Sequence, residues 1–255
     1  MGLGSSFGIT SETNNNIQTD GLVFYVDAAY KSSYPRSGTT WTDLYDNSLS
    51  GSLTNSPTFN TEGYFDFDGS NDYIHTNFNI DVGTGDFSVC FWIKADVWAD
   101  SSNDNLDYMA VLSNGTYNSP QSARWSGYSF ARVGSFWGTN VSGHTRGGLN
   151  FICRDEDNGA AATNDALSTD TWYHVCGTKT SNTLRLYLNG VVQDTTFDAD
   201  LTVNQTPNLF IGRMADATYP RYFNGQIPLV QIYNKALTAG QVLQNYNAQK
   251  QRFGI

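Results

Sequence analysis

The sequence predicts a single all-β domain, and three observations support this. Aromatic residues make up 14% of the 255 residues, glycine occurs 24 times, and charged residues make up only 15%. This composition suits short strands joined by tight turns better than helices. The run L-R-L-Y-L at 184–188 alternates in polarity and is followed by Asn189-Gly190, the pair that a tight hairpin turn favours. An all-β chain of this length is commonly one domain with a sizeable core.

Residues 1–20 are expected to form a flexible arm, and residues 21–255 the folded domain. Gly, Ser, Thr and Asn dominate the arm and its apolar residues are isolated, so it cannot bury enough surface to fold alone. The first strand is expected at 21–27, where L-V-F-Y-V is continuous. Tyr-Pro, Ser-Gly and Trp-Thr pairs within 28–43 predict a loop.

Two strands at 64–67 and 73–75 are predicted on either side of a turn at 68–72, which reads D-G-S-N-D. The strand at 87–94 has apolar side chains on both faces, which predicts a place in the middle of a sheet.

The middle of the chain is richer in Asp, Asn, Ser and Gly, and one strand is expected near 108–112 between two long loops. Further strands are predicted at 127–136 and 148–153, and a loop at 154–170.

The segment 172–194 predicts a three-strand meander, because T-S-N and then N-G interrupt its apolar runs. The last strands are expected at 208–213 and 225–233, where Pro228 indicates an edge or a bulge. Thr238 and the glutamine three residues later form a capping-box pattern, and apolar residues then recur at helical spacing. A short C-terminal helix is therefore expected at about 239–249.

Several of these strings together resemble a known family. W-Y-H-V at 172–175 followed by L-R-L-Y-L-N-G, F-D-G-S-N-D-Y at 67–73 and the closing strand at 225–233 are similar to the laminin G-like branch of the concanavalin A-like lectin/glucanase superfamily. The resemblance implies a two-sheet antiparallel jelly-roll sandwich. The opening G-L-V-F-Y-V-D-A-A resembles laminin G-like domains in structural proteins of tailed phages and other viruses.

The superfamily contains glycoside hydrolases, which place two carboxylates around the scissile bond. In the related glucanases these are two glutamates on one strand. Here Glu12, Glu62 and Glu156 are the only glutamates, and no two of them share a strand face. Asp66 and Asp68 are the only strand pair at that spacing, and a strand end with its turn is the preferred interpretation.

No other catalytic pattern is present. His75, His144 and His174 lack metal-ligand spacing, and His174 is expected to be a structural strand residue. Neither a nucleophile motif nor a phosphate-binding glycine loop follows any predicted strand. We therefore expect a protein without enzymatic activity and without catalytic residues.

The net charge of −10 is spread along the chain and disfavours a nucleic-acid partner. Cys90, Cys153 and Cys176 each fall in a predicted strand, so they are expected to be reduced, buried core residues. The first 20 residues lack a secretory signal pattern and no segment is long enough to insert into a membrane. Synthesis in a host cytoplasm is therefore expected, and the resemblance to viral structural proteins implies a place in a virion.

Two non-enzymatic functions fit the sequence. One is a virion structural protein, a capsid decoration or a tail or fibre component, that contacts other virion proteins through the N-terminal arm or the C-terminal helix and is expected to be a homo-oligomer. The other is a lectin-like module that binds host surface glycan, and the two are compatible. An alternative is a carbohydrate-binding or adhesion module of a bacterial surface protein. Aromatic side chains in or near loops are the candidates for stacking on sugar rings, with core packing as the competing role: Trp98, Tyr117, Trp125, Trp137 and Tyr219.

The family resemblance also suggests a structural Ca²⁺, since related sandwiches carry one near a sheet rim. Asp68, Asn71 and Asp72 offer the hard oxygen ligands that Ca²⁺ requires. The alternative is that the segment is a plain turn whose side chains bond their own backbone.

Overall fold

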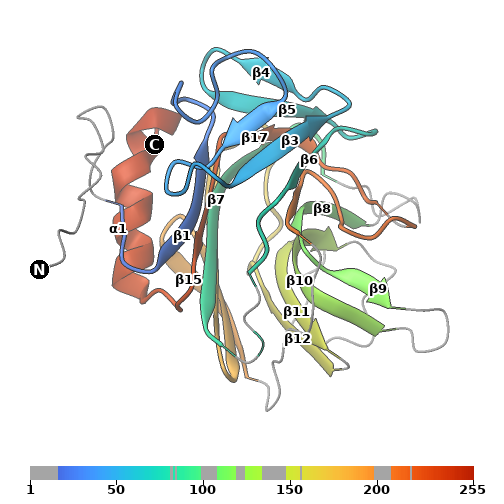
Figure 1. Ribbon diagram of the computed structural model, residues 1–255. Helices are drawn as coiled ribbons and strands as arrows, with labels where there is room; N and C mark the ends of the chain where they lie inside the picture. The colour runs from blue at the N-terminus through green and yellow to red at the C-terminus, as the bar shows by residue number, and fades with distance from the viewer. Residues whose placement is uncertain are drawn as a thin grey trace, which may run out of the picture.

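The protein is a sandwich of two antiparallel sheets with one helix packed on its outside (Figure 1). The computed structural model describes residues 17–80, 83, 85–98, 108–118, 124–133, 148–155, 157–197, 208–218 and 220–255. This all-β jelly-roll architecture confirms the fold class predicted from the sequence. Within the described residues, no helix is long and apolar enough to cross a membrane.

Nine strands of the described chain form the sheet next to the helix, which we call the helix-side sheet. They are β1 (Leu22–Asp27), β4 (Thr58–Asn60), β5 (Tyr64–Asp68), β7 (Phe87–Ala95), β13 (Tyr173–Thr180), β14 (Thr183–Leu188), β15 (Val191–Phe197), β17 (Asn224–Ile227) and β18 (Leu229–Tyr233).

Nine more strands among the described residues form the second sheet, which we call the far sheet. They are β2 (Thr40–Thr42), β3 (Ser50–Thr54), β6 (Tyr73–Thr76), β8 (Tyr108–Ser113), β9 (Thr116–Asn118), β10 (Arg124–Val133), β11 (Leu149–Asp155), β12 (Asp157–Ala162) and β16 (Phe210–Ile211).

Strand β7 lies in the middle of the helix-side sheet, as its sequence predicts. It pairs with β13 on one side and with β17 and β18 on the other. Phe87, Val89, Phe91 and Ile93 belong to the main core between the sheets, whereas Trp92 belongs to a second cluster on the outer face. Both faces of β7 are therefore covered, which explains why neither face is polar.

The meander predicted at 172–194 is present as β13, β14 and β15. Asn189 and Gly190 both have positive φ, 51° and 79°, as the two-residue turn between Leu188 and Val191 requires.

Pro228 separates β17 from β18 at a bulge. Gln226 pairs with Lys94, and Val230 pairs with Phe91. An advance of four residues from β17 to β18 therefore matches an advance of three residues along β7. Proline has no N–H to donate, and the extra residue accommodates it in the interior of the sheet. Of the edge and the bulge that Pro228 indicated, the structure confirms the bulge.

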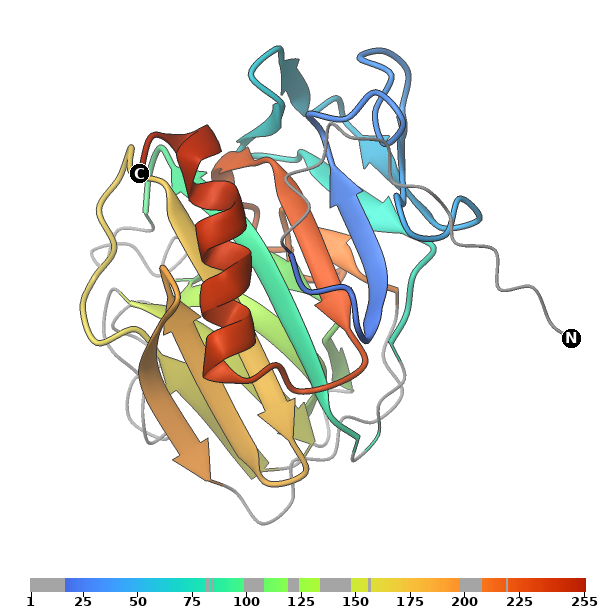
Figure 2. The same ribbon diagram turned by 90° about the vertical axis from the view of Figure 1, so that its left-hand side faces the viewer.

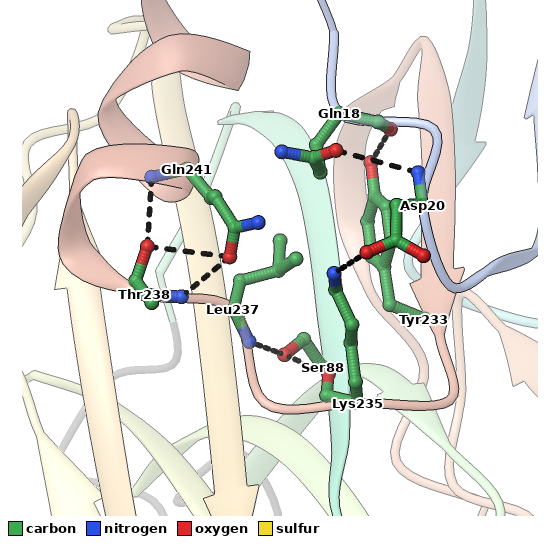
Figure 3. A network of polar contacts seen from close by, with 8 residues as sticks. All are labelled: Gln18, Asp20, Ser88, Tyr233, Lys235, Leu237, Thr238 and Gln241. Atoms are coloured by element: carbon green, nitrogen blue, oxygen red, sulfur yellow. Dashed lines mark hydrogen bonds and ion pairs between the residues drawn. The ribbon is translucent and has the colours of Figure 1, made fainter.

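Helix α1 (Ala239–Gln249) has the predicted bounds and continues into a 3₁₀ turn, η1 (Lys250–Phe253). The hydroxyl of Thr238 accepts from the backbone N–H of Gln241, and the Gln241 side chain accepts from the N–H of Thr238, which is the predicted capping box (Figure 3). Figure 2 shows the helix lying across the outer face of the helix-side sheet. Its buried Val242 joins the outer cluster there.

The final residues of the predicted arm lie against the domain, so ordered contacts begin before residue 21. Ile17 packs on the outer cluster, and the Gln18 backbone N–H donates to Asn245 of α1 at 2.7 Å. The Tyr233 hydroxyl donates to the Gln18 carbonyl at 3.0 Å, and Lys235 forms an ion pair with Asp20 (Figure 3). Residues 1–16 lie outside the described part of the chain.

The prediction that all three cysteines are reduced is wrong for two of them. Cys90 of β7 and Cys176 of β13 occupy directly paired positions, with their Cα atoms 4.1 Å apart, and form a disulfide. Cys153 is free and buried, as expected. The sequence placed each cysteine in a strand but did not show that two of those strands are neighbours.

Three short strands lie where loops were expected: β2, β9 and β12. Strand β12 reads D-N-G-A-A-A, a composition with low strand propensity, yet it pairs with β11 along its whole length. Pairing with a neighbouring strand outweighs local propensity here.

The C-terminal 3₁₀ turn is tied to β1 by an ion pair between Arg252, which is partly exposed to solvent, and the buried Asp27. Arg252 donates from Nη1 to both carboxylate oxygens of Asp27 at 2.8 Å, and its Nη2 donates to the carbonyl of Gly63. Asp27 also accepts from the Tyr25 hydroxyl at 3.1 Å and from the Ala29 N–H at 2.9 Å. Its carboxylate is therefore buried but fully partnered.

Candidate functional site

The predicted stacking residues are distributed over several parts of the fold. Trp98 is only 9% exposed, and its indole N–H donates to the Ser168 carbonyl at 3.1 Å, so most of its ring packs inside the protein. Tyr117 of β9 and Trp125 of β10 occupy directly paired positions of one hairpin. Trp137 and Tyr219 lie outside the described residues.

The predicted calcium segment forms a turn that bonds its own backbone. Asp68 Oδ1 accepts from the N–H groups of Ser70, Asn71 and Asp72 at 2.8, 3.1 and 3.4 Å. Burial acts to raise the pKa of Asp68, but these donors outweigh it and hold the pKa below its usual range. Burial, followed by the Asp68 charge, raises the pKa of Asp72. Among the described residues, no three His, Cys, Asp or Glu side chains converge to hold a metal ion.

The two aspartates considered for hydrolysis are engaged in structural contacts. Asp66 accepts from the side-chain amide of Gln226 at 2.9 Å, and Asp68 caps its turn. Glu62 is exposed in a turn, while Glu12 and Glu156 lie outside the described residues, as does His144.

His174 is a buried residue of β13, which confirms its predicted structural role. Burial lowers the pKa of His174 to about 3. Its ring lies 5.4 Å from that of Trp92 and 6.0 Å from that of Tyr246 in α1.

A group of aromatic side chains gathers on the outer face of the far sheet, and we call it the aromatic patch. Tyr73 and His75 of β6 alternate with the core residue Ile74, so they point away from the core. His75 stacks on Phe210 of β16 with ring centroids 4.3 Å apart. Tyr73 lies 5.9 Å from Phe210 and 6.5 Å from Tyr222. The patch thus comprises Tyr73, His75, Phe210 and Tyr222.

Arg213 lies beneath the aromatic patch. Its guanidinium carbon is 4.8, 5.1 and 5.6 Å from the ring centres of Tyr73, Phe210 and Tyr222. Nε and Nη2 donate to the carbonyls of Met214 and Asp216 at 2.6 and 2.9 Å, and the residue is 9% exposed. Cation–π contacts with three rings and two carbonyl acceptors therefore fix the arginine in place.

Gly212 allows the chain to make the sharp turn that brings Arg213 under the rings. Its φ of +86° is in the left-handed region, and a Cβ there would lie 2.6 Å from the Phe67 ring.

The patch combines apolar ring surface with polar edges. His75 is exposed while the three other rings are partly exposed. Partial burial, together with the Arg213 charge, lowers the pKa of His75, so its neutral ring both donates and accepts near pH 7. Such a surface suits a ligand with apolar C–H faces and hydroxyl edges. Sequence reasoning missed it because its members are brought together by β6 and β16, which are far apart in the chain.

Several solved structures share this fold at low identity. The receptor-binding domain of botulinum neurotoxin D has a TM-score of 0.63 and 17% identity over 90% of this chain and 53% of that chain. The ligand-binding domain of the same serotype in complex with N-acetylneuraminic acid has a TM-score of 0.63 and 18% identity, and the match covers 90% of this chain and 51% of that chain. Trypanosoma rangeli sialidase in complex with the inhibitor DANA has a TM-score of 0.63 and 13% identity, and the match covers 92% of this chain and 34% of that chain.

This chain spans about half the length of the neurotoxin chains and about a third of the sialidase chain. At these identities the likeness concerns the fold alone. No curated protein matches the sequence. The Laminin_G_3 family, described as the concanavalin A-like lectin/glucanases superfamily, matches residues 68–243. Because this match covers more than half of the sequence and agrees with the jelly-roll sandwich, the chain belongs to that family of concanavalin A-like domains.

Proposed function

We propose that the protein is a non-enzymatic, lectin-like carbohydrate-binding protein that contacts glycan through the aromatic patch. The observation that carries the proposal is the cluster of four partly or fully exposed rings held around the buried Arg213. Aromatic rings with polar edges bind amphipathic sugar rings, and the arginine below adds positive potential that favours acidic sugars. A neurotoxin domain of the same fold binds N-acetylneuraminic acid, which supports this choice of ligand class.

We further propose that this binding serves a virion. The support is the resemblance of G-L-V-F-Y-V-D-A-A at 21–29 and the strings after it to laminin G-like domains of viral structural proteins. In this role the protein decorates a capsid or forms part of a tail or fibre. It binds other virion proteins through residues 1–20 or α1 and assembles as a homo-oligomer. Detection of the protein in purified particles by mass spectrometry is the test, and recovery only from a bacterial surface would favour the adhesion alternative.

Binding through the patch is tested with a glycan array and then by titration of the best glycans on that array. Replacing both Phe210 and Tyr222 by Ala is expected to weaken binding at least about tenfold, or about 1.4 kcal/mol. Tyr45→Ala is the matched control, because Tyr45 is 63% exposed and lies outside the patch. Circular dichroism establishes that both variants are folded. Unchanged glycan binding by the folded double variant would exclude the patch as the binding site.

The absence of catalysis is tested separately. Incubation with β-glucans, galactans and sialosides is expected to release neither reducing ends nor free sialic acid. Turnover that Asp66→Asn abolishes would show that the protein is a hydrolase.

A further inference from the structure

A row of polar side chains crosses the outer face of the helix-side sheet, on the opposite sheet from the aromatic patch. Asp66 of β5 pairs with Gln226 of β17, and Gln226 pairs with Lys94 of β7. Paired residues of neighbouring strands lie on the same face, so these three side chains are adjacent. Asp96 joins the row just after β7, and two aromatic residues border it. The polar row therefore consists of Tyr64, Asp66, Lys94, Asp96, Trp172 and Gln226.

Gln226 is the centre of this row. It is only 5% exposed, and its Nε2 donates to Asp66 Oδ1 at 2.9 Å and to Asp96 Oδ1 at 2.8 Å. The amide head therefore lies between the two carboxylates. Its Oε1 is buried and has no hydrogen-bond partner among the described residues. A buried carbonyl oxygen without a donor is costly, so the row lacks one hydrogen-bond donor.

The row also has an aromatic border and a cation. The Tyr64 and Trp172 rings meet edge to face with centroids 5.8 Å apart, and both are partly exposed. Lys94 Nζ lies 5.9 Å from the Tyr64 ring centre and 5.2 Å from that of Trp172. The two carboxylates and this ammonium group give the row a net charge of −1 at neutral pH.

We propose that the polar row is a second carbohydrate site, which binds a neutral pyranose. Vicinal hydroxyls of the sugar donate to Asp66 and Asp96, another hydroxyl supplies the donor that Gln226 Oε1 lacks, and the C–H edge of the ring contacts Trp172. The net negative charge repels carboxylated sugars, so this site and the aromatic patch differ in ligand class. The inference rests on the proposed lectin function and assigns it a second subsite.

Hydrolysis is the competing role for a carboxylate pair. Because one nitrogen lies 2.9 and 2.8 Å from the two Oδ1 atoms, these oxygens are less than about 6 Å apart, close to the roughly 5–5.5 Å of retaining glycoside hydrolases. In this protein, however, the amide of Gln226 occupies the space between the carboxylates, where a hydrolase holds the scissile bond. The geometry therefore favours binding.

The experiment is NMR titration of the ¹⁵N-labelled protein with the methyl glycosides of glucose, galactose and mannose, and separately with N-acetylneuraminic acid. At millimolar concentration at least one neutral glycoside is expected to shift the Gln226 side-chain amide and the Trp172 indole N–H resonances. N-acetylneuraminic acid is expected to leave both resonances unshifted. The double replacement Asp66→Asn with Asp96→Asn keeps an acceptor for Gln226. It is expected to weaken binding of the neutral glycoside at least tenfold. Asp165→Asn, which alters an exposed aspartate that is not a member of the row, is expected to change nothing.

The results separate this proposal from the proposed function. Shifts that persist in the Phe210→Ala, Tyr222→Ala variant assign the neutral sugar to the polar row. Array binding without any shift at Gln226 or Trp172 overturns the second site and leaves the patch in place. Shifts that are equal in the wild type and the double Asn variant, or release of reducing sugar that Asp96→Asn stops, also overturn it. If the site is overturned by the missing or unchanged shifts, Gln226 is a structural tie between β5 and the end of β7. If sugar is released, Asp66 and Asp96 are a catalytic pair.

Discussion

Acid is expected to destabilise the protein through His174, and the structure gives the size of the effect. The ring is fully buried under α1, between Trp92 and Tyr246, and its two nitrogens have no partner among the described residues. Burial lowers its pKa from 6.5 to about 3. The folded state therefore stays unprotonated over a range in which the unfolded state binds a proton.

Stability from this residue is complete above pH 6.5 and is lost as the pH falls from 6.5 towards 3. Each pH unit in that window costs about 1.4 kcal/mol, so at about pH 4.5 the loss is about 3 kcal/mol. His174→Phe keeps a ring between the two aromatic neighbours and cannot titrate. Its free energy of unfolding is expected to match the wild type within about 1 kcal/mol at pH 7 and to exceed it by about 3 kcal/mol at pH 4.5.

Urea unfolding followed by tryptophan fluorescence measures this difference at both pH values. Burial also raises the pKa of Asp27 and Asp43, which adds stability as the pH falls, but both groups are present in the two proteins and cancel in the comparison. Equal losses of stability in the wild type and His174→Phe between pH 7 and 4.5 would refute the reasoning.

Three further predictions concern other parts of the fold. Arg252→Ala leaves the Asp27 carboxylate buried without its cation and is expected to lower the free energy of unfolding by about 3–5 kcal/mol, whereas adding Asp27→Asn to it should recover part of the loss; no recovery in urea unfolding would contradict this. Gly177→Ala places a Cβ 2.5 Å from the Phe130 ring in the main core and is expected to cost about 1–3 kcal/mol, so an unchanged melting temperature would show that the sheets can separate to accept it. If the turn at 68–72 holds Ca²⁺, the melting temperature rises with Ca²⁺ and falls with chelator, and Asp72→Ala removes that difference; identical melting curves would leave the self-bonded turn as the full description.

Local signals in the sequence were sufficient for much of the fold. The Asn189-Gly190 turn, the two-faced apolar strand β7 and the capping box of Thr238 each depend on residues within a few positions of one another. Such patterns report directly on backbone conformation and burial.

The candidate sites could not be predicted in the same way, because they depend on which strands are neighbours. Gln226 lies 160 residues from Asp66 and 130 from Asp96, and only the pairing of β5, β17 and β7 brings them together. The disulfide between β7 and β13 was missed for the same reason. Among the predicted stacking residues, aromatic type and loop position did not show that the Trp98 ring is packed inside the protein.

The arrangement of residues 17–20 and α1 gives the domain a direction. Residues 17–20 and α1 lie together on the outer face of the helix-side sheet, while the aromatic patch lies on the far sheet (Figures 1 and 3). A larger assembly that binds the protein through residues 17–20 and α1 would hold the patch pointing outward, away from the attachment. Many copies fixed in this orientation would present a multivalent surface, on which individually weak sugar contacts combine into strong adhesion.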